Sequence, residues 1–347
     1  MRLSHRNFPG HSATTLSIFL VLIVGTAYSA AADVAQSMGG SKFVEVDGIR
    51  TRYFEGGSGE PIVLVHGGHY GMAGGAARFM PLFPLLAEHF HVYAVDKLGM
   101  GLTDNPKEDS GYSMQATTQH IYRFMQTLGL ENVHLAGHSR GALPVARIAM
   151  DHPELIQTLT IFNSNTLAPG DPKPSAPNLR PLGPPATKES IRENLMSRPN
   201  TYRKEYVTDE YVEAQLEVAL HPKTRRAAER LDRLRKRFIE RNPDKVDARP
   251  ALANNSGTGW WLYEVKDSTL KMLHGGQLKT PTLVIWGYND PSATHEMAAD
   301  LFRVISRSAN QAQLHFFNRC GHAPYHEYPQ GVTDLLVSFT GKLENQR

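Results

Sequence analysis

The stretch Val133–Gly141 (VHLAGHSRG) decides how this chain folds. Its first four residues are mostly apolar and predict a β-strand, and Ala142–Met150 directly after it predicts a helix. The last five residues of the stretch match G-x-S-x-G, a pattern that has meaning only at a sharp turn from a strand into a helix. Its two glycines leave space where a Cβ would clash. We therefore expect the Ser139 hydroxyl to project above the edge of a sheet.

Other apolar runs in the chain have the length and composition of strands that are buried on both faces. Helix-like stretches lie between them. In Phe43–Phe54, apolar and polar residues alternate on both sides of the turn signal Asp47-Gly48, which is the pattern of a β-hairpin. Strands that alternate with helices predict an α/β fold with a mostly parallel central sheet flanked by helices. The predicted strands are Ile62–Val65, Val92–Val95, Val133–Ala136, Leu159–Phe162, Leu283–Trp286 and Leu314–Phe317. The predicted helices are Phe79–Glu88, Met114–Leu128, Leu143–Met150, Glu296–Ser306 and Val332–Leu343.

The alternation stops between residues 165 and 279, which we interpret as a helical cap inserted into a core made of residues 33–164 and 280–347. Pro169–Pro185 holds seven prolines and predicts an irregular crossing segment. Two polar helices follow, over Tyr211–Leu220 and Arg225–Ile239. Within the second, residues 225–238 carry seven Arg or Lys against two acidic residues. We interpret these basic residues as a helix face exposed to solvent, and the alternative is that they bind an anionic surface or substrate.

The N-terminus predicts an exported protein. Arg2, His5 and Arg6 precede the apolar run Leu16–Tyr28, and small residues follow it, as in a secretory signal peptide spanning residues 1–32. The run has 13 residues, fewer than the roughly 18 that a membrane span needs. A secreted or periplasmic location is the first interpretation and a retained membrane anchor is the second.

Charge and cysteine content exclude several functions. Removing residues 1–32 lowers the formal net charge from +3 to +1, so the charge gives no support to nucleic-acid binding. Cys320 is the only cysteine, which excludes an internal disulfide and C-x-x-C metal clusters. We interpret it as a small buried filler. No cofactor, metal or membrane partner is expected, and the sequence does not give the oligomeric state.

A serine hydroxyl needs a base and an orienting acid to become a nucleophile. His322 follows the strand Leu314–Phe317 on a loop that can return toward Ser139, and it is the predicted base. Asp290 ends the loop after the strand Leu283–Trp286 and is the predicted acid, which would fix the histidine tautomer. The loop after the preceding strand, 163–165, offers no carboxylate. We expect His326 to have a surface role, and His134 and His138 to be part of the scaffold.

The tetrahedral intermediate also needs donors for its oxyanion. His66-Gly67-Gly68-His69 follows a buried strand, so the N–H of Gly68 and that of Arg140 are the predicted donors. For the His66 side chain we prefer a structural hydrogen bond that shapes this loop. His69 and Tyr70 are candidate pocket residues. In Asp96–Gly101 a third glycine is missing from the dinucleotide fingerprint, so we expect a turn at a strand end rather than a phosphate loop.

Taken together, these motifs resemble those of the α/β-hydrolase superfamily. The resemblance covers nearly everything after Gly40 except the details of the cap, and the chain order Ser139, Asp290, His322 is that of the family. Dehalogenases and epoxide hydrolases of the fold carry aspartate at the Ser139 position. Within the superfamily the chain is most similar to meta-cleavage-product hydrolases, which cut a carbon–carbon bond beside a carbonyl in ring-opened aromatic acids. Phe43–Tyr53, His66–Gly75 and Asp96–Pro106 carry this similarity.

Three positions differ from that subfamily, which usually has asparagine before the nucleophile, methionine after it and tryptophan after the histidine. Here these residues are His138, Arg140 and Ala323. Arg140 would bind an anionic group or form a structural ion pair. Ala323 is a candidate pocket residue, and Trp260 and Trp261 would form an apolar lid or pack the cap onto the sheet. The resemblance implies residues that grip a dienoate, and the changes favour another substrate.

The leading hypothesis from the sequence is an exported, cofactor-free serine hydrolase for a small or medium apolar carbonyl compound. Carboxylic ester cleavage comes first and C–C cleavage of a meta-cleavage-type dienoate second. A hydrolase-fold protein that binds a ligand as a sensor is the alternative of a different class.

Overall fold

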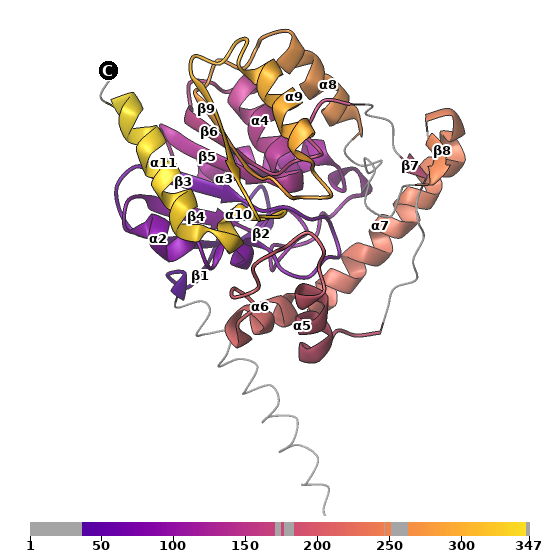
Figure 1. The fold of residues 1–347 in the computed structure, drawn as a ribbon. Coiled ribbons are helices and arrows are strands. Elements are labelled where there is room, and N and C mark those ends of the chain that lie inside the picture. The colour runs from indigo at the N-terminus through magenta and orange to yellow at the C-terminus, as the bar shows by residue number, and fades with distance from the viewer. Residues whose placement is uncertain (1–36, 171–174, 177–183, 246, 251–262, 345–347) are drawn as a thin grey trace, which may run out of the picture.

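The computed structural model describes residues 37–170, 175–176, 184–245, 247–250 and 263–344. The predicted export segment and the predicted pocket residues Trp260 and Trp261 lie outside these residues. An eight-stranded sheet forms the centre of the molecule, with the strand order β1-β2-β4-β3-β5-β6-β9-β10 (Figure 1). The pairings β1–β2 and β2–β4 are antiparallel, and the other pairings in this sheet are parallel. The predicted α/β fold with a mostly parallel sheet is confirmed.

Each apolar run that predicted a strand lies within an observed one. Strands β5, β6 and β9 are buried along their whole length, and β3 and β4 are buried except at their first residue. Continuous apolar runs arise in such strands because helices cover both faces of the sheet. The strands are β1 Ser41–Val46, β2 Ile49–Gly56, β3 Pro61–Val65, β4 His91–Val95, β5 Val133–His138, β6 Ile156–Phe162, β9 Thr282–Gly287 and β10 Ala312–Phe317, and a separate short pair is formed by β7 Ser175–Ala176 and β8 Asp247–Pro250.

The hairpin between β1 and β2 turns at Asp47 and Gly48, as predicted. Both residues have positive φ values, 50° and 73°. Such a turn matches the right-handed twist of the two strands and favours Asp-Gly.

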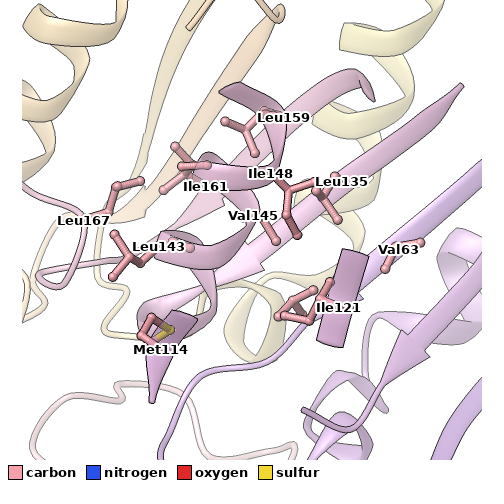
Figure 2. Packing of buried hydrophobic residues seen from close by; sticks show 14 of the residues in the cluster. Val63, Met114, Ile121, Leu135, Leu143, Val145, Ile148, Leu159, Ile161 and Leu167 are labelled. Carbon is pink, nitrogen blue, oxygen red and sulfur yellow. The ribbon is translucent and has the colours of Figure 1, made fainter. Parts of the chain in front are cut away.

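Helices cover the sheet on its two faces (Figure 1). Helices α3, α4, α8 and α9 pack on one face, and α2 and α11 pack on the other. Figure 2 shows α4 side chains packed on strands β5 and β6 in the first of these layers. The helices are α2 Phe83–Ala87, α3 Met114–Thr127, α4 Ala142–Asp151, α8 Tyr263–His274, α9 His295–Ile305, α10 Pro324–Glu327 and α11 Pro329–Glu344.

The single helix predicted over Phe79–Glu88 is wrong. The chain instead forms a 3-10 turn, Ala76–Phe79, and then the short helix α2. Pro81 and Pro84 explain the break, because proline lacks the N–H that a helix interior needs. Pro84 is tolerated because it stands in the first turn of α2.

The segment between β6 and β9 supplies the helices α5 Lys188–Met196, α6 Asp209–Leu220 and α7 Pro222–Arg241. They gather beyond the end of the sheet, and α7 reaches away from the core (Figure 1). Helix α8 packs on α4 and α9, so we propose that the core resumes at α8, ahead of residue 280. Among the described helices, none combines the length and the apolar character of a membrane span.

Several basic residues of α7 form ion pairs within the protein. Arg237 lies 2.8 Å from the Asp109 carboxylate, and Arg230 contacts the same carboxylate. Arg225 pairs with Glu229 one turn along the helix. These contacts support the interpretation of α7 as a solvated helix with internal ion pairs.

Candidate active site

Ser139 lies at the turn between β5 and α4, in a strained backbone conformation. Its φ is +53°, a value that residues other than glycine seldom adopt. The glycines on either side are required by close packing: a Cβ on Gly137 would lie 2.4 Å from Val145 Cγ2, and one on Gly141 would lie 2.4 Å from the Val65 oxygen. The turn therefore has the geometry expected of a nucleophile elbow.

His322 and Asp290 are paired at the same end of the sheet. His322 Nδ1 lies 2.6 Å from Asp290 Oδ2, which also accepts a hydrogen bond from Asn163 Nδ2 at 2.8 Å. The other carboxylate oxygen accepts from the Ser292 N–H and hydroxyl. Burial alone would raise the pKa of Asp290, but the His322 imidazole and the hydrogen bonds outweigh burial and hold it below its usual value. An ionised Asp290 keeps the proton of His322 on Nδ1 and leaves Nε2 as an acceptor, and the role of His322 as the base stays a prediction.

The backbone of His322 is tied to the residue that precedes Ser139. His138 Nε2 lies 2.8 Å from the His322 carbonyl oxygen, and the two imidazole rings are 4.8 Å apart between centroids. Because a carbonyl only accepts, Nε2 of His138 must donate. Its Nδ1 then accepts from the Tyr325 hydroxyl at 3.0 Å. Burial lowers the pKa of His138 well below 6.5, so the ring is neutral. His138 is scaffold, as predicted, and it places His322 beside the turn of Ser139.

The other two histidines considered as bases are engaged elsewhere. His134 Nδ1 contacts Thr158 and its Nε2 contacts Glu60, so His134 is also scaffold, as predicted. The predicted surface role of His326 is wrong, because its side chain is buried. Its ring stacks on Tyr206 at 4.3 Å, and its Nε2 lies 2.7 Å from the Arg78 carbonyl oxygen. Cap residues therefore cover a histidine that looks exposed in the sequence.

The loop after β3 passes directly over Ser139. A Cβ on Gly67 would lie 2.8 Å from Ser139 Cβ, and Gly68 has a φ of +78°. His66 shapes the loop through the predicted structural hydrogen bonds. Its Nδ1 donates to the Gly67 oxygen at 2.7 Å, and its Nε2 accepts from the Lys97 N–H at 3.1 Å. This arrangement brings the backbone of Gly68 near Ser139, and the role of Gly68 as an oxyanion donor stays a prediction.

Lys97 was not singled out in the sequence, but its side chain is buried beneath this loop. Its Nζ donates to the Gly68 oxygen at 3.1 Å. Burial, with the nearby Arg140 and Arg78 guanidinium groups, lowers the pKa of Lys97 well below its usual value. Burial and Arg235 of α7 lower the pKa of Arg140 to about 10. Basic side chains therefore lie close together beside the turn of Ser139, and burial and mutual repulsion disfavour the charged form of Lys97.

His69 and Tyr70 follow the loop, and their pocket roles stay predictions. His69 Nδ1 lies 2.9 Å from the Tyr70 oxygen, and burial together with Arg140 lowers the pKa of His69 to about 3. The Tyr70 hydroxyl donates to the Gly111 oxygen at 3.1 Å and contacts Thr117. Tyr70 thus braces the loop that precedes α3.

Asp96–Gly101 forms a turn after β4, as predicted. The buried Asp96 carboxylate accepts from the Ala76 N–H, the Leu102 N–H and Arg52 Nε at 2.6, 2.8 and 2.6 Å. A Cβ on Gly101 would lie 1.9 Å from this carboxylate. The glycine therefore makes room for a side chain of the protein itself, and no phosphate is needed to explain it.

Arg78 and Gln215 are two further polar side chains that the sequence did not reveal. Arg78 belongs to the 3-10 turn after the glycine-rich loop, and Gln215 belongs to α6; both are buried. Within the described part of the chain, Arg78 Nε and Gln215 Nε2 have no hydrogen-bond acceptor. Both side chains border Gly74, where a Cβ would lie 3.0 Å from Arg78 Nε and 2.1 Å from Gln215 Oε1. Two buried donors thus lack an acceptor among the described residues.

Ala323 is buried in the apolar cluster that includes Tyr325, so its side chain is a small packing group next to His322. Cys320 is buried, as predicted, and burial raises the pKa of its thiol. Among the described residues, no cluster of three or more His, Cys, Asp or Glu side chains is arranged to hold a metal ion.

Comparison with known proteins places the chain in a family. A model of the family described as the alpha/beta hydrolase fold matches residues 60–329. The chain is 25% identical over 303 residues to a 2-hydroxy-6-oxo-6-(2'-aminophenyl)hexa-2,4-dienoic acid hydrolase from Metapseudomonas resinovorans, covering 87% of this chain and 91% of that protein. It is 27% identical over 310 residues to a 2-hydroxy-6-oxononadienedioate/2-hydroxy-6-oxononatrienedioate hydrolase from Cupriavidus pinatubonensis, covering 87% and 96%.

A solved structure gives the same result for the fold. The meta-cleavage product hydrolase of Pseudomonas fluorescens IP01 matches with a TM-score of 0.62 and 23% identity, over 89% of this chain and 99% of that one. The sheet order, the strained turn at Ser139 and the family match agree. This chain is therefore a hydrolase that belongs to the α/β-hydrolase fold family.

Proposed function

We propose that the protein is an exported serine hydrolase that cleaves a carboxylic ester of small or medium size through an acyl-enzyme. The observation that carries the proposal is the contact of 2.6 Å between His322 Nδ1 and Asp290, beside the strained turn of Ser139. Export rests on the signal-peptide pattern of residues 1–32 alone.

In the proposed reaction, Ser139 Oγ attacks the substrate carbonyl and His322 Nε2 takes the hydroxyl proton. The imidazolium that forms is stabilised by Asp290. The N–H groups of Gly68 and Arg140 bind the oxyanion, and His322 then returns the proton to the leaving alcohol. Water, activated by the same histidine, attacks the acyl-enzyme and releases the acid and free Ser139.

The surroundings of Ser139 support an ester more than a dienoate. In meta-cleavage-product hydrolases an asparagine before the nucleophile helps to hold the substrate. Here both ring nitrogens of His138 are bound to Tyr325 and His322, so its ring offers no free donor or acceptor to a substrate. The tryptophan that follows the histidine in that subfamily is replaced by the small, buried Ala323.

A second candidate function is C–C bond cleavage of a dienoate of the meta-cleavage type. Relatives named as dienoate hydrolases align over most of their length. We infer that the buried donors Arg78 Nε and Gln215 Nε2, which lack an acceptor among the described residues, would suit a substrate that carries a carboxylate, because a charged acceptor would satisfy both.

Two substrates and one probe separate these functions. The purified protein should be labelled by a fluorophosphonate and should hydrolyse a p-nitrophenyl ester faster than a ring-fission dienoate. The reverse order of the two specific activities would establish the C–C reaction instead. A folded protein that neither reacts with the probe nor turns over either substrate would be a binding protein.

Substituting Gly67 should damage the site without unfolding the protein. In Gly67→Ala the new Cβ would lie 2.8 Å from Ser139 Cβ and 2.9 Å from His138 Nδ1, so the loop or the serine must move. When reacting groups are misplaced by about 1 Å, kcat/KM falls by about 100-fold. Ester hydrolysis measures the loss. The matched control is Gly341→Ala, where a Cβ meets nothing within 4 Å; equal activities of the two variants would contradict the placement of this loop.

Removing the charge of Arg78 should separate anionic from neutral substrates. We expect Arg78→Gln to raise KM for a carboxylate-bearing substrate roughly 10-fold or more, since a hydrogen bond to a charged group contributes about 1.5–3 kcal/mol. KM for a neutral p-nitrophenyl ester should change by less than about threefold on the same argument. Steady-state kinetics with both substrates provide the measurement. An equal loss for both would show that Arg78 serves only the structure.

A further inference from the structure

Glu327 links the loop that carries His322 to the cap. It is the last residue of the short helix α10 and is buried. Its Oε1 accepts a hydrogen bond from the Gly321 N–H at 2.8 Å. Its Oε2 accepts from the N–H groups of Tyr202 and Arg203 at 2.9 and 3.0 Å. One carboxylate thus joins the backbone before His322 to the cap segment between α5 and α6.

A second link joins the same two segments. The N–H of His322 donates to the Asn200 oxygen at 2.7 Å. The segments are in close contact, because a Cβ on Gly321 would lie only 2.1 Å from the Asn200 oxygen and 2.9 Å from the Thr201 nitrogen. Beyond them, the Arg203 guanidinium lies over the Tyr328 ring at 4.1 Å. We call Asn200–Arg203, Gly321–His322 and Glu327 the cap clasp.

Different groups of His322 are held by residues of the core and by residues of the cap. The imidazole is oriented by core residues, Asp290 and Ser292. The main-chain N–H is held by the cap, and the main-chain carbonyl is held by His138 of the core. A buried carboxylate that loses a donor carries a large desolvation cost, so the segments joined by Glu327 are expected to move together.

From this geometry we infer that Glu327 is a positioning residue: it holds His322 in register with Ser139 by fastening the histidine loop to the cap. The inference rests on the proposed function, in which His322 is the base. It implies that the cap helps to assemble the reacting groups in addition to covering the substrate.

The test compares Glu327→Gln with Glu217→Gln. Glutamine keeps the size of Glu327 but presents an NH₂ group where one oxygen now accepts N–H donors, so one or two of the three N–H bonds to this side chain are lost. Glu217 is the matched control, since it is a cap carboxylate that faces the core at Arg52, 3.7 Å away, without touching the histidine loop. Both changes remove one negative charge between cap and core.

We expect the rate of fluorophosphonate labelling and kcat for a p-nitrophenyl ester to fall about 10-fold or more in Glu327→Gln, with KM within about twofold. Glu217→Gln should keep both rates. Hydrogen exchange should rise at the amides of residues 202, 203 and 321 only in Glu327→Gln. A wild-type labelling rate in a Glu327→Gln protein that shows this faster exchange would overturn the inference.

Two further results keep this test separate from the proposed function. If the wild-type protein is not labelled at all, the serine hydrolase proposal fails, and the inference about Glu327 fails with it. If the wild type is labelled and only the Glu327 comparison fails, the hydrolase proposal stands. Should Glu327→Gln not fold, Arg203→Ala loosens the clasp from the cap side by removing the contact with Tyr328. We expect it to slow labelling two- to fivefold, and an unchanged rate would again overturn the inference.

Discussion

Replacing Ser139 by alanine is expected to abolish fluorophosphonate labelling and to lower kcat for ester hydrolysis by about 10⁴-fold or more. The physical reason is that the variant has no nucleophile for the acyl-enzyme, so only the binding and oxyanion groups can still assist water. Folding should be preserved, because alanine is smaller than serine and the glycines that allow the turn remain. Labelling with mass-spectrometric detection and steady-state kinetics give the two readouts.

The control for this experiment is Ser268→Ala on α8, where the hydroxyl contacts Val265 and Arg147. This variant should keep wild-type labelling and activity. A Ser139→Ala protein that is still labelled at the wild-type rate would remove Ser139 from the mechanism and with it the proposed function.

Acidification is expected to destabilise the protein sharply between pH 6.5 and 5.5. The buried residues His66, His120, His138 and His326 have pKa values lowered by burial, to about 4 for His120 and about 3 for His326. In the unfolded chain they take up protons near pH 6.5, but in the folded protein they stay neutral. The unfolded state therefore binds more protons, and stability falls as pH falls.

Between pH 6.5 and 5.5, the free energy of unfolding is expected to fall by roughly 1 kcal/mol for each histidine, or by about 4 kcal/mol for the four. This decrease is large against a total stability of about 5–15 kcal/mol. Urea unfolding at pH 7.5, 6.5 and 5.5 measures it. In His120→Gln the decrease in the free energy of unfolding should be smaller by the contribution of one histidine. His89→Gln, at an exposed position, should leave this decrease unchanged. A free energy of unfolding that stays constant over this range would contradict the neutral state of these rings.

The sequence predicts most of the core and of the candidate site because the signals there are local. G-x-S-x-G between an apolar run and a helix indicates the turn of Ser139 without knowledge of any distant contact. His322 and Asp290 each follow a strand, and the carboxyl ends of parallel strands meet at one edge of a sheet. These two residues were therefore predictable as neighbours, and the structure places them 2.6 Å apart.

The errors and omissions concern contacts between distant segments. His326 looks exposed beside Glu327 and Pro329, but aromatic residues of the cap cover it. Gln215 lies on a predicted helix, but the periodicity of that helix does not show what its buried face meets. The bonds from Glu327 to Tyr202 and Arg203 span more than 120 positions. Nothing in the neighbouring sequence identifies these contacts, because the packing of the cap on the core creates them.

The place of the cap in the chain also governs how the protein is made. Strand β6 pairs with β9 in parallel, but residues 163–281 separate the two strands. While a ribosome is still synthesising this stretch, one side of β6 presents unpaired N–H and C=O groups to any other strand nearby. Such long-range pairing is slow to form. The nascent chain therefore cannot pair β6 on both sides until translation has passed Gly287. Until then the unpaired side of β6 is a site at which the chain can aggregate.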